Sequence, residues 1–380
     1  MLKKIFFVIT ARASLPRVKS VIETCKKKKN LKVYVIAASS MVSNKYGEAV
    51  KDLKKNGIEC NWQLPCLFDD HHISSQPNST ANLILQLTSI FHNNRPDAVL
   101  TVADRYETIA TAIAASYMNI PLLHLLGGEV TGNIDEKVRH SITKLSDFHF
   151  VSNKDSFSRV KKMGENPKNI FITGCPSIDI AKESKKYSIK KIVLDGVGNN
   201  IDLSKDYCVV LQHPNTSRYM YSRDDVKCIL KAIKKIDCQC VWFWPNPDAG
   251  TSQLSEGIRS FRELEKIDNV YFVKHLQDIK FLSLLNSSKC LIGNSSVGIR
   301  ECSYLGVPVV NIGDRQKNRL RANNVLDTTH NLESIISSIK KQFQRKKYKS
   351  SNIYGDGNSG KKISEIISKL SFTYEKQITY

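Results

Sequence analysis

The chain alternates short apolar runs with amphipathic segments, and this rhythm constrains its fold more than any other feature. In the first half, it predicts strands at residues 5–10, 32–37, 98–102, 121–126, 148–152 and 170–173. It predicts helices between them, at residues 15–28, 44–56, 80–93 and 106–118. Such a repeat is typical of a parallel sheet with helices on both faces. The segment Cys60 to Pro77 lacks a clear period and contains His71-His72, which predicts a long loop and a candidate lid.

The rhythm stops in a Lys-rich segment and then restarts. Further strands are predicted at residues 207–211, 241–244, 270–273, 290–292 and 308–312, with helices at 224–236, 252–264, 279–285 and 298–305. Because 380 residues exceed one ordinary core, we expect an α/β protein with two Rossmann-like domains. The expected boundaries are 1–180, a linker at 181–205, 206–358, and a final helix and tail at 359–380. Two such domains facing each other would form a cleft, where small-molecule sites prefer to lie.

Composition narrows the class of protein. No apolar run reaches the roughly 18 residues of a membrane span, and the first apolar run meets Arg12 without a signal-peptide cleavage site, so a cytoplasmic location is expected. Ten Cys residues are scattered without the spacing of a metal site, which argues against zinc. The net charge of +21 is spread along the chain and is not interleaved with aromatic residues. This favours an acidic small molecule over nucleic acid or a membrane as the partner.

Acidic side chains follow two predicted strands. Asp104 comes directly after strand 98–102, and Glu129, Asp135 and Glu136 follow strand 121–126. Ligands of α/β proteins bind outside the carboxyl ends of strands, so these groups predict an acid/base centre. For any single carboxylate the alternative stays open that it simply occupies the favourable end of a helix. Two cations belong to the same motifs, Arg105 and Arg139.

Cations and small polar residues follow other predicted strands. The first turn of a helix has free backbone amides that suit a phosphate, and guanidinium groups can bind the same anion. The predicted diphosphate site comprises Arg12, Arg17, His213, Ser295, Ser296, Arg315 and Arg319. Glu301 stands further along the helix that Ser295 begins and could accept bonds from ribose hydroxyls. An ordinary Ser cap, a structural His and a solvated basic loop are the open alternatives.

Several ordered motifs resemble the UDP-N-acetylglucosamine 2-epimerase family, and in particular its hydrolysing branch, which opens sialic-acid and related nonulosonic-acid synthesis. The matching blocks are Asp104-Arg105, residues 127–145, Gly174-Cys175-Pro176-Ser177, Leu211-Gln212-His213-Pro214, and residues 245–250, 292–296, 311–316 and 354–358. The resemblance implies a glycosyltransferase-B-like fold whose C-terminal helix crosses back to the first domain. It also implies a dimer or tetramer of identical subunits.

The resemblance further implies roles for single residues. Acid/base chemistry falls to Asp104, Glu129, Asp135 and Glu136, while His213 assists the leaving diphosphate. The implied substrate-binding residues are Arg12, Arg17, Arg105, Arg139, Asn246, Asn294, Ser295, Ser296, Glu301, Arg315 and Arg319. The implied reaction converts UDP-N-acetylglucosamine into N-acetylmannosamine and UDP through a glycal. No nicotinamide cofactor is expected, because epimerisation involves no net redox change, and no metal is expected, because the sequence shows no cluster of metal ligands.

Two departures from the family pattern bear on the substrate. Ala103 stands where members often have Gly, and Arg12-Ala13-Ser14-Leu15 replaces the usual Arg-Ala-Asp/Glu-Tyr. The second departure removes a carboxylate and a phenol from the sugar side. UDP- or GDP-N,N'-diacetylbacillosamine, as in the legionaminic-acid route, is therefore an alternative substrate, and non-hydrolysing epimerisation is an alternative outcome. A UDP-sugar-dependent glycosyltransferase and a non-catalytic sugar-nucleotide sensor would share the fold.

Overall fold

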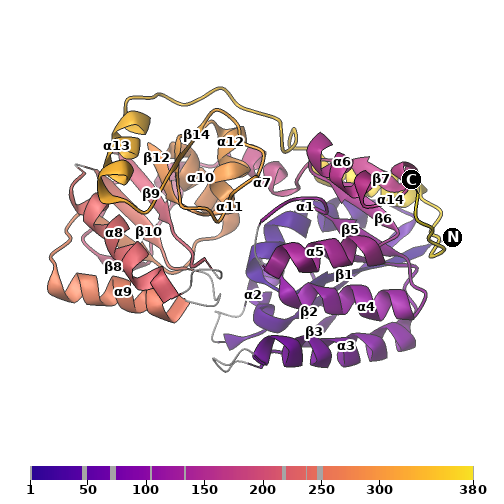
Figure 1. The fold of residues 1–380 in the computed structure, drawn as a ribbon. Helices are drawn as coiled ribbons and strands as arrows, with labels where there is room; N and C mark the ends of the chain where they lie inside the picture. The colour runs from indigo at the N-terminus through magenta and orange to yellow at the C-terminus, as the bar shows by residue number, and fades with distance from the viewer. Residues whose placement is uncertain are drawn as a thin grey trace. The chain divides into compact units, whose positions relative to one another are not determined.

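The computed structural model describes residues 2–44, 49–68, 74–102, 105–131, 134–215, 220–236, 238–245 and 251–379 (Figure 1). The chain divides into two compact units. Unit 1 comprises Met1–Val130, Ile134–Asp179 and Tyr354–Tyr380, and unit 2 comprises Thr131–Asn133 and Ile180–Ile353. Each unit is built on a seven-stranded sheet. The predicted α/β class is therefore confirmed, and so is the return of the C-terminal helix to the first unit.

The sheet of unit 1 is parallel throughout, with the order β3-β2-β1-β4-β5-β6-β7. Its strands are β1 (Lys3–Ile9), β2 (Leu31–Ala38), β3 (Trp62–Leu64), β4 (Ala98–Val102), β5 (Leu122–Leu125), β6 (Phe148–Val151) and β7 (Ile170–Ile172). The strand order reverses between β1 and β4. The carboxyl ends of these two strands therefore form the switch point, where α/β sheets bind ligands.

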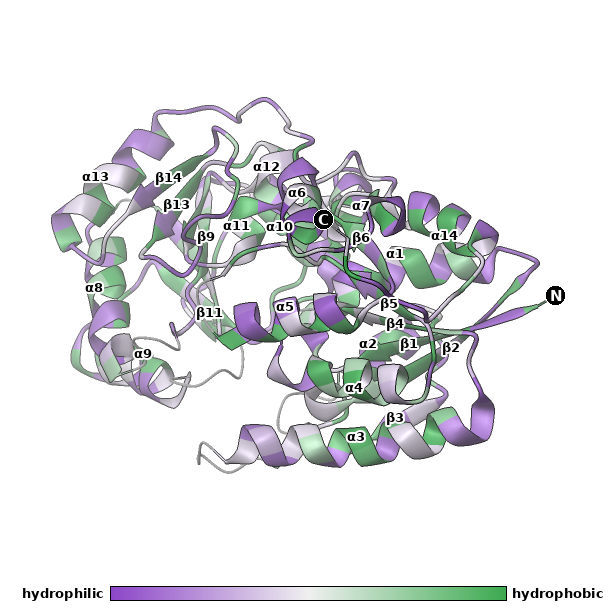
Figure 2. Ribbon diagram, turned by 45° about the vertical axis from the view of Figure 1, so that its right-hand side comes forward, coloured by the Kyte–Doolittle hydropathy of each residue, from purple (hydrophilic) through white to green (hydrophobic). Residues whose placement is uncertain are grey.

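Helices cover both faces of this sheet (Figure 1). They are α1 (Leu15–Lys26), α2 (Val50–Lys55), α3 (Ser75–Asn94), α4 (Ile109–Tyr117), α5 (Ile134–Leu145), α6 (Lys154–Lys162) and α14 (Ser359–Lys369). The boundary between the units falls within α7 (Ser177–Ser184), whose residues Ile180 and Ala181 pack in the core of unit 2. Buried side chains of α3, α4 and α5 pack with Phe6 and Val8 on one face. The adjacent residues of β1 are buried as well, and the central strands β1, β4 and β5 are mostly green in Figure 2. Burial on both faces explains why these strands are continuous apolar runs.

The C-terminal helix α14 is tied to unit 1 by a buried carboxylate. Asp179 accepts hydrogen bonds from the backbone amides of Ser359 at 2.8 Å and Gly360 at 2.7 Å. The same side chain accepts a third bond at 2.8 Å from the hydroxyl of Ser20 on α1. These bonds satisfy amide groups that the first turn of a helix leaves without intrahelical partners. Helices α1 and α14 then pack against each other along their length.

Unit 2 repeats the doubly wound design with the order β14-β13-β12-β9-β10-β11-β8. Its strands are β8 (Gly196–Gly198), β9 (Tyr207–Leu211), β10 (Gln239–Phe243), β11 (Val270–Val273), β12 (Cys290–Gly293), β13 (Val309–Ile312) and β14 (Val325–Thr328). Among the strands that the described residues form in this unit, only β8, at the edge, runs antiparallel to its neighbour. Here the order reverses between β9 and β12, which places the switch point of this sheet at their carboxyl ends.

Two apolar layers enclose the second sheet. The helices are α8 (Ser222–Lys234), α9 (Thr251–Leu264), α10 (Asp278–Ser287), α11 (Ser296–Ile299), α12 (Glu301–Leu305) and α13 (Leu332–Phe343). One layer joins α8, α9 and α13 around buried Trp242, and the other joins α10 and α12 to the sheet. The second layer also takes up Tyr187, Leu194 and Leu203. The segment expected to be a linker, residues 181–205, thus packs within unit 2.

Some predicted elements differ from the structure. The predicted loop 60–77 contains strand β3, and α3 already begins at Ser75; the candidate lid residues His71-His72 lie outside the described residues. The predicted helix 298–305 is interrupted at Arg300, whose backbone ψ of −69° separates α11 from α12. Within the described ranges, no helix combines the length and the apolarity needed to cross a membrane.

Candidate functional site

At the switch point of unit 2, two loops are joined by a reciprocal pair of hydrogen bonds. The backbone amide of His213 donates to Asn294 Oδ1 at 2.8 Å, and Asn294 Nδ2 donates to the carbonyl of His213 at 2.8 Å. His213 follows β9 and Asn294 follows β12. The two strands thus end in one rigid unit, and both predicted residues are buried there.

Gly293 allows this close approach of the two strand ends. Its φ of +132° is a conformation that side chains disfavour, and a Cβ atom would lie 2.1 Å from the carbonyl oxygen of Leu211. A larger residue would therefore separate β12 from β9. The Gly in the motif Gly293-Asn294-Ser295-Ser296 is required by packing at the switch point.

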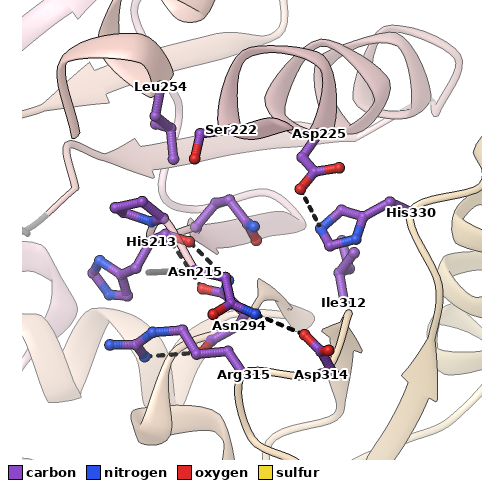
Figure 3. A pocket seen from close by; sticks show the side chains of 12 residues that line it. His213, Asn215, Ser222, Asp225, Leu254, Asn294, Ile312, Asp314, Arg315 and His330 are labelled. Carbon is purple, nitrogen blue, oxygen red and sulfur yellow. Dashed lines mark hydrogen bonds and ion pairs between the residues drawn. The ribbon is translucent and has the colours of Figure 1, made fainter. Parts of the chain in front are cut away.

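A small polar pocket opens beside this pair (Figure 3). Residues that line it include Gln212, His213, Asn215, Asp225, Asn294, Asp314, Arg315 and His330. Asn215 Nδ2 donates to Asp314 Oδ1 at 2.7 Å, and His330 Nε2 lies 3.7 Å from Asp225 Oδ2. Both pairs link segments that are far apart in the sequence. The pocket combines two carboxylates, two imidazoles and a guanidinium, so it can offer both donors and acceptors to a polar ligand.

The loop after β13 closes one side of this pocket. Arg315 Nη1 donates to the carbonyl of Asn294 at 3.3 Å, and Gln316 Nε2 donates to the same oxygen at 2.9 Å. Arg319 is 6% exposed. The predicted pair Arg315 and Arg319 is therefore held against the body of unit 2. This arrangement differs from the solvated basic loop that was the alternative.

The short helix after β12 carries the predicted phosphate-binding residues. Ser295 caps α11, and its hydroxyl accepts from the amide of Val297 at 3.4 Å. Ser296 Oγ accepts from Arg300 Nη2 at 3.0 Å. The buried guanidinium of Arg300 also lies 4.0 Å from the carboxylate of Glu301. The Ser cap foreseen as an alternative is thus present, and it places Ser296 beside a buried cation.

At the switch point of unit 1, Arg12 follows β1 and its Nε lies 3.4 Å from Asp52 Oδ2. Arg17 is buried in the first turns of α1. After β4, Arg105 Nε donates to Glu107 Oε1 at 2.8 Å. Glu107 is fully buried, and no hydrogen bond to its Oε2 is found among the described residues. Asp104, the predicted acid/base residue at this strand end, lies outside the described residues.

The loop after β5 brings Glu129 toward the start of α5. Gly128 has φ +75°, and a Cβ there would lie 2.4 Å from the carbonyl oxygen of Ser156. Glu129 is 5% exposed, and its carbonyl accepts from Arg139 Nη1 at 2.9 Å. Asp135 and Glu136 occupy the first turn of the same α5. We call Glu129, Asp135 and Glu136 the carboxylate cluster. Arg139 links the loop that carries Glu129 to helix α5, which carries Asp135 and Glu136.

A buried polar network lies behind this loop. His124 Nδ1 is 3.2 Å from Thr143 Oγ1, and its ring meets the ring of His149 edge-on at 6.2 Å between centroids. Burial first, then the charges of His149 and Arg139, lower the pKa of His124 well below its ordinary value. His149 Nε2 in turn lies 3.0 Å from Glu165 Oε2. Burial would raise the pKa of Glu165, but hydrogen bonds from His149, Lys144 and Lys376 lower it to about 2.

Sequence reasoning missed several residues of these sites. Glu107, Asp225, Asp314 and His330 line or support them, yet only Asp314 stood inside a motif that the sequence singled out. His330 follows β14, and Asp225 belongs to α8. A strand assigned to Val325–Thr328 would have placed His330 at a strand end, where ligand-binding residues gather. Asn246, predicted to bind substrate, lies outside the described residues.

Two doubly wound sheets of this kind define the class of glycosyltransferase-B-like α/β proteins. The sequence model of the UDP-N-acetylglucosamine 2-epimerase family matches residues 23–368. The chain therefore belongs to that family, which confirms the prediction from the motifs.

Similar proteins extend this finding. The chain is 30% identical over 372 residues to a UDP-N,N'-diacetylbacillosamine 2-epimerase (hydrolyzing) of Legionella pneumophila, covering 97% of each chain. It is 30% identical over 334 residues to a GDP/UDP-N,N'-diacetylbacillosamine 2-epimerase (hydrolyzing) of Campylobacter jejuni, covering 87% of this chain and 85% of that one. A crystal structure of UDP-GlcNAc 2-epimerase from Neisseria meningitidis bound to UDP-GlcNAc has a TM-score of 0.81 and 21% identity, over 97% of this chain and 100% of that chain. This last likeness supports the fold.

Proposed function

We propose that this protein is a hydrolysing 2-epimerase of UDP-linked 2-acetamido sugars, which releases the free epimerised sugar and UDP. The observation that carries the proposal is a similarity over 97% of the chain to a relative whose name states the hydrolysing reaction. The carboxylate cluster on unit 1 and the polar pocket at the unit 2 switch point supply the functional groups that the reaction requires. UDP-N-acetylglucosamine is the substrate that the sequence motifs favour.

The chemistry proceeds in two stages. A carboxylate removes the C2 proton while the C1–O bond breaks, which leaves a glycal and UDP. A second acidic side chain, in its protonated carboxyl form, then gives its proton to the opposite face of C2, and the oxygen of water bonds to C1. The proton that this water loses passes to the carboxylate that the second side chain has become, while the proton first taken from C2 is released to solvent. Two faces require two separately placed acids, for which Asp104, Glu129, Asp135 and Glu136 are the candidates.

The leaving diphosphate develops negative charge as the C1–O bond breaks. Hydrogen-bond donors and cations fixed before the reaction stabilise such charge without reorganisation. We assign this role to Arg12, Arg17 and His213, and we assign UDP binding to Asn294, Ser295, Ser296, Glu301, Arg315 and Arg319. Arg105, Arg139 and Asn246 complete the proposed substrate contacts. The network around the carbonyls of His213 and Asn294 supports this assignment, because it holds the strand ends rigid.

A second substrate is favoured by a specific observation. Two relatives at 30% identity are named for N,N'-diacetylbacillosamine, and Ser14 stands where the family pattern has an acidic residue. We therefore propose UDP- or GDP-N,N'-diacetylbacillosamine as the alternative substrate within the same reaction.

A product assay over a small panel of sugar nucleotides tests the proposal. The protein is incubated with each UDP- and GDP-sugar, with and without an acceptor sugar, and products are separated by anion-exchange chromatography. We expect free nucleoside diphosphate and free sugar in equal amounts, without any acceptor. Release that depends on an acceptor would indicate a glycosyltransferase. An intact epimerised nucleotide sugar would indicate the non-hydrolysing reaction, and tight binding without turnover would indicate a sensor.

A further inference from the structure

The last residues of the chain follow a fixed path over unit 1. After α14 ends, the ring of Phe372 meets Phe148 of β6 edge-on, 6.2 Å between centroids. Further on, the backbone amide of Thr379 donates to the carbonyl of Gly164 at 2.9 Å. Gly164 has no room for a side chain here, because a Cβ would lie 2.4 Å from Ile378. The segment between these two anchors, residues 373–377, is therefore held close to β6 and to the end of α5.

Lys376 in this segment caps the C-terminal end of α5. Its Nζ donates to the carbonyls of Thr143 at 3.1 Å, Lys144 at 2.7 Å and Ser146 at 2.6 Å. These oxygens belong to the turn where a helix leaves carbonyls without partners and where its dipole favours a positive charge. The same Nζ lies 2.6 Å from Glu165 Oε2, and Glu165 is 2% exposed. One ammonium group thus fixes both the helix end and a buried carboxylate.

The other end of α5 belongs to the carboxylate cluster. Asp135 and Glu136 lie in its first turn, and Arg139, one turn on, holds the carbonyl of Glu129. Thr143 continues the chain of contacts, since its hydroxyl donates to the carbonyl of Arg139 at 3.1 Å. A helix is stiff along its axis, so a shift at Thr143 moves the first turn with it.

A second route leads from Lys376 to the same loop. Glu165 contacts both Lys376 and His149, and His149 packs on His124. His124 then touches the loop itself, because a Cβ on Gly127 would lie only 2.8 Å from His124 Nδ1. Two sets of contacts, which are joined by the hydrogen bond between His124 and Thr143, therefore run from one lysine to both elements that carry the carboxylates.

We infer that Lys376 is a positioning residue for the carboxylate cluster, through which the C-terminal tail sets the geometry of the reaction. The inference rests on the proposed function for its catalytic readout. Misplacing reactive groups by about 1 Å is enough to slow an enzyme by orders of magnitude, while substrate binding through other groups is maintained. Among the described residues, those that Lys376 Nζ contacts are Thr143, Lys144, Ser146 and Glu165, and none of these is proposed to contact the substrate.

The test compares Lys376→Met with Lys369→Met in the full-length protein. Lys369 is exposed at the end of α14, so its replacement removes the same charge from the same part of the chain. We expect Lys376→Met to lower kcat about tenfold with KM changed less than about twofold. Lys369→Met should match the wild type, and Lys376→Arg, which retains the donors and the charge, should recover most of kcat.

Hydrogen exchange provides a readout that does not need the reaction. We expect the backbone amides of residues 127–131 and 134–139 to exchange several-fold faster in Lys376→Met and unchanged in Lys369→Met. If Lys376→Met lowers the melting temperature but leaves kcat and the exchange of these residues unchanged, the inference is overturned. The tail would then stabilise unit 1 without positioning the carboxylates. If the wild type proves inactive on every sugar nucleotide, the proposed function fails, and the exchange comparison still decides whether Lys376 positions the cluster.

Discussion

Glu129 is the most deeply buried of the acid/base candidates that the structure describes. It is buried, follows β5 and is coupled to α5 through Arg139. Glu129→Gln keeps the shape but removes the proton acceptor, so kcat should fall by about 10² to 10⁴. Asp155→Asn, an exposed change in the first turn of α6, serves as the control and should keep full activity. Steady-state assays of UDP release check both; equal activity of the two variants would remove Glu129 from the mechanism.

The lowered pKa of Glu165 leads to a prediction about stability rather than activity. Its pKa in the folded protein, about 2, lies below the ordinary value of 4.5. A depressed carboxylate pKa stabilises the fold above pH 4.5, and this stabilisation, about 3 kcal/mol, is lost as the pH falls toward 2. Urea unfolding of the wild type and of Glu165→Gln should therefore differ most at neutral pH and converge on acidification. A difference that stayed constant from pH 7 to pH 3 would contradict the assignment.

The residues that sequence patterns could identify are those next to strand ends. Glu129, His213, Asn294 and Arg315 were predicted because polar residues that follow apolar runs are visible in the sequence. The sequence did not predict Asp225 and His330, because their pairing depends on how α8 and the segment after β14 meet in space. Tertiary proximity of this kind leaves no local pattern.

At the scale of elements, the attachment of α14 depends on the cap that Asp179 provides. Asp179→Ala would leave the amides of Ser359 and Gly360 without their acceptor, which should cost about 1 to 3 kcal/mol of unfolding free energy. Glu365→Ala, on the same helix, is the control and should cost less than about 0.5 kcal/mol. Denaturant unfolding measures both. Equal losses would mean that α14 is held by its apolar face alone.

The prediction of helices and strands succeeded where the hydrophobic pattern was strong, and it failed at short or edge strands. The parallel core strands β1, β4 and β9 are long apolar runs and were predicted close to their observed bounds. β8 is Gly196-Val197-Gly198 and owes its strand form to pairing with β11, so its own sequence carries no strand pattern. β3 likewise has three residues and depends on β2.

At the scale of the whole molecule, both units share the same doubly wound arrangement of strands. In each sheet the strand order reverses once, at β1 and β4 in unit 1 and at β9 and β12 in unit 2. Arg12, Arg105, His213 and Asn294 follow these four strands, whereas Glu129 and Arg315 follow the neighbouring strands β5 and β13. The two-unit division and the return of α14 follow from the family pattern, whereas the substrate depends on a few side chains that the fold does not fix.

The central claim is that carboxylates exchange the proton at C2 of the sugar while the C1–O bond is broken. The most direct measurement is an NMR time course of the protein with UDP-N-acetylglucosamine in D₂O. Our account predicts free N-acetylmannosamine that carries deuterium at C2, together with UDP. Free sugar with the original proton retained at C2, or unepimerised N-acetylglucosamine, would contradict it.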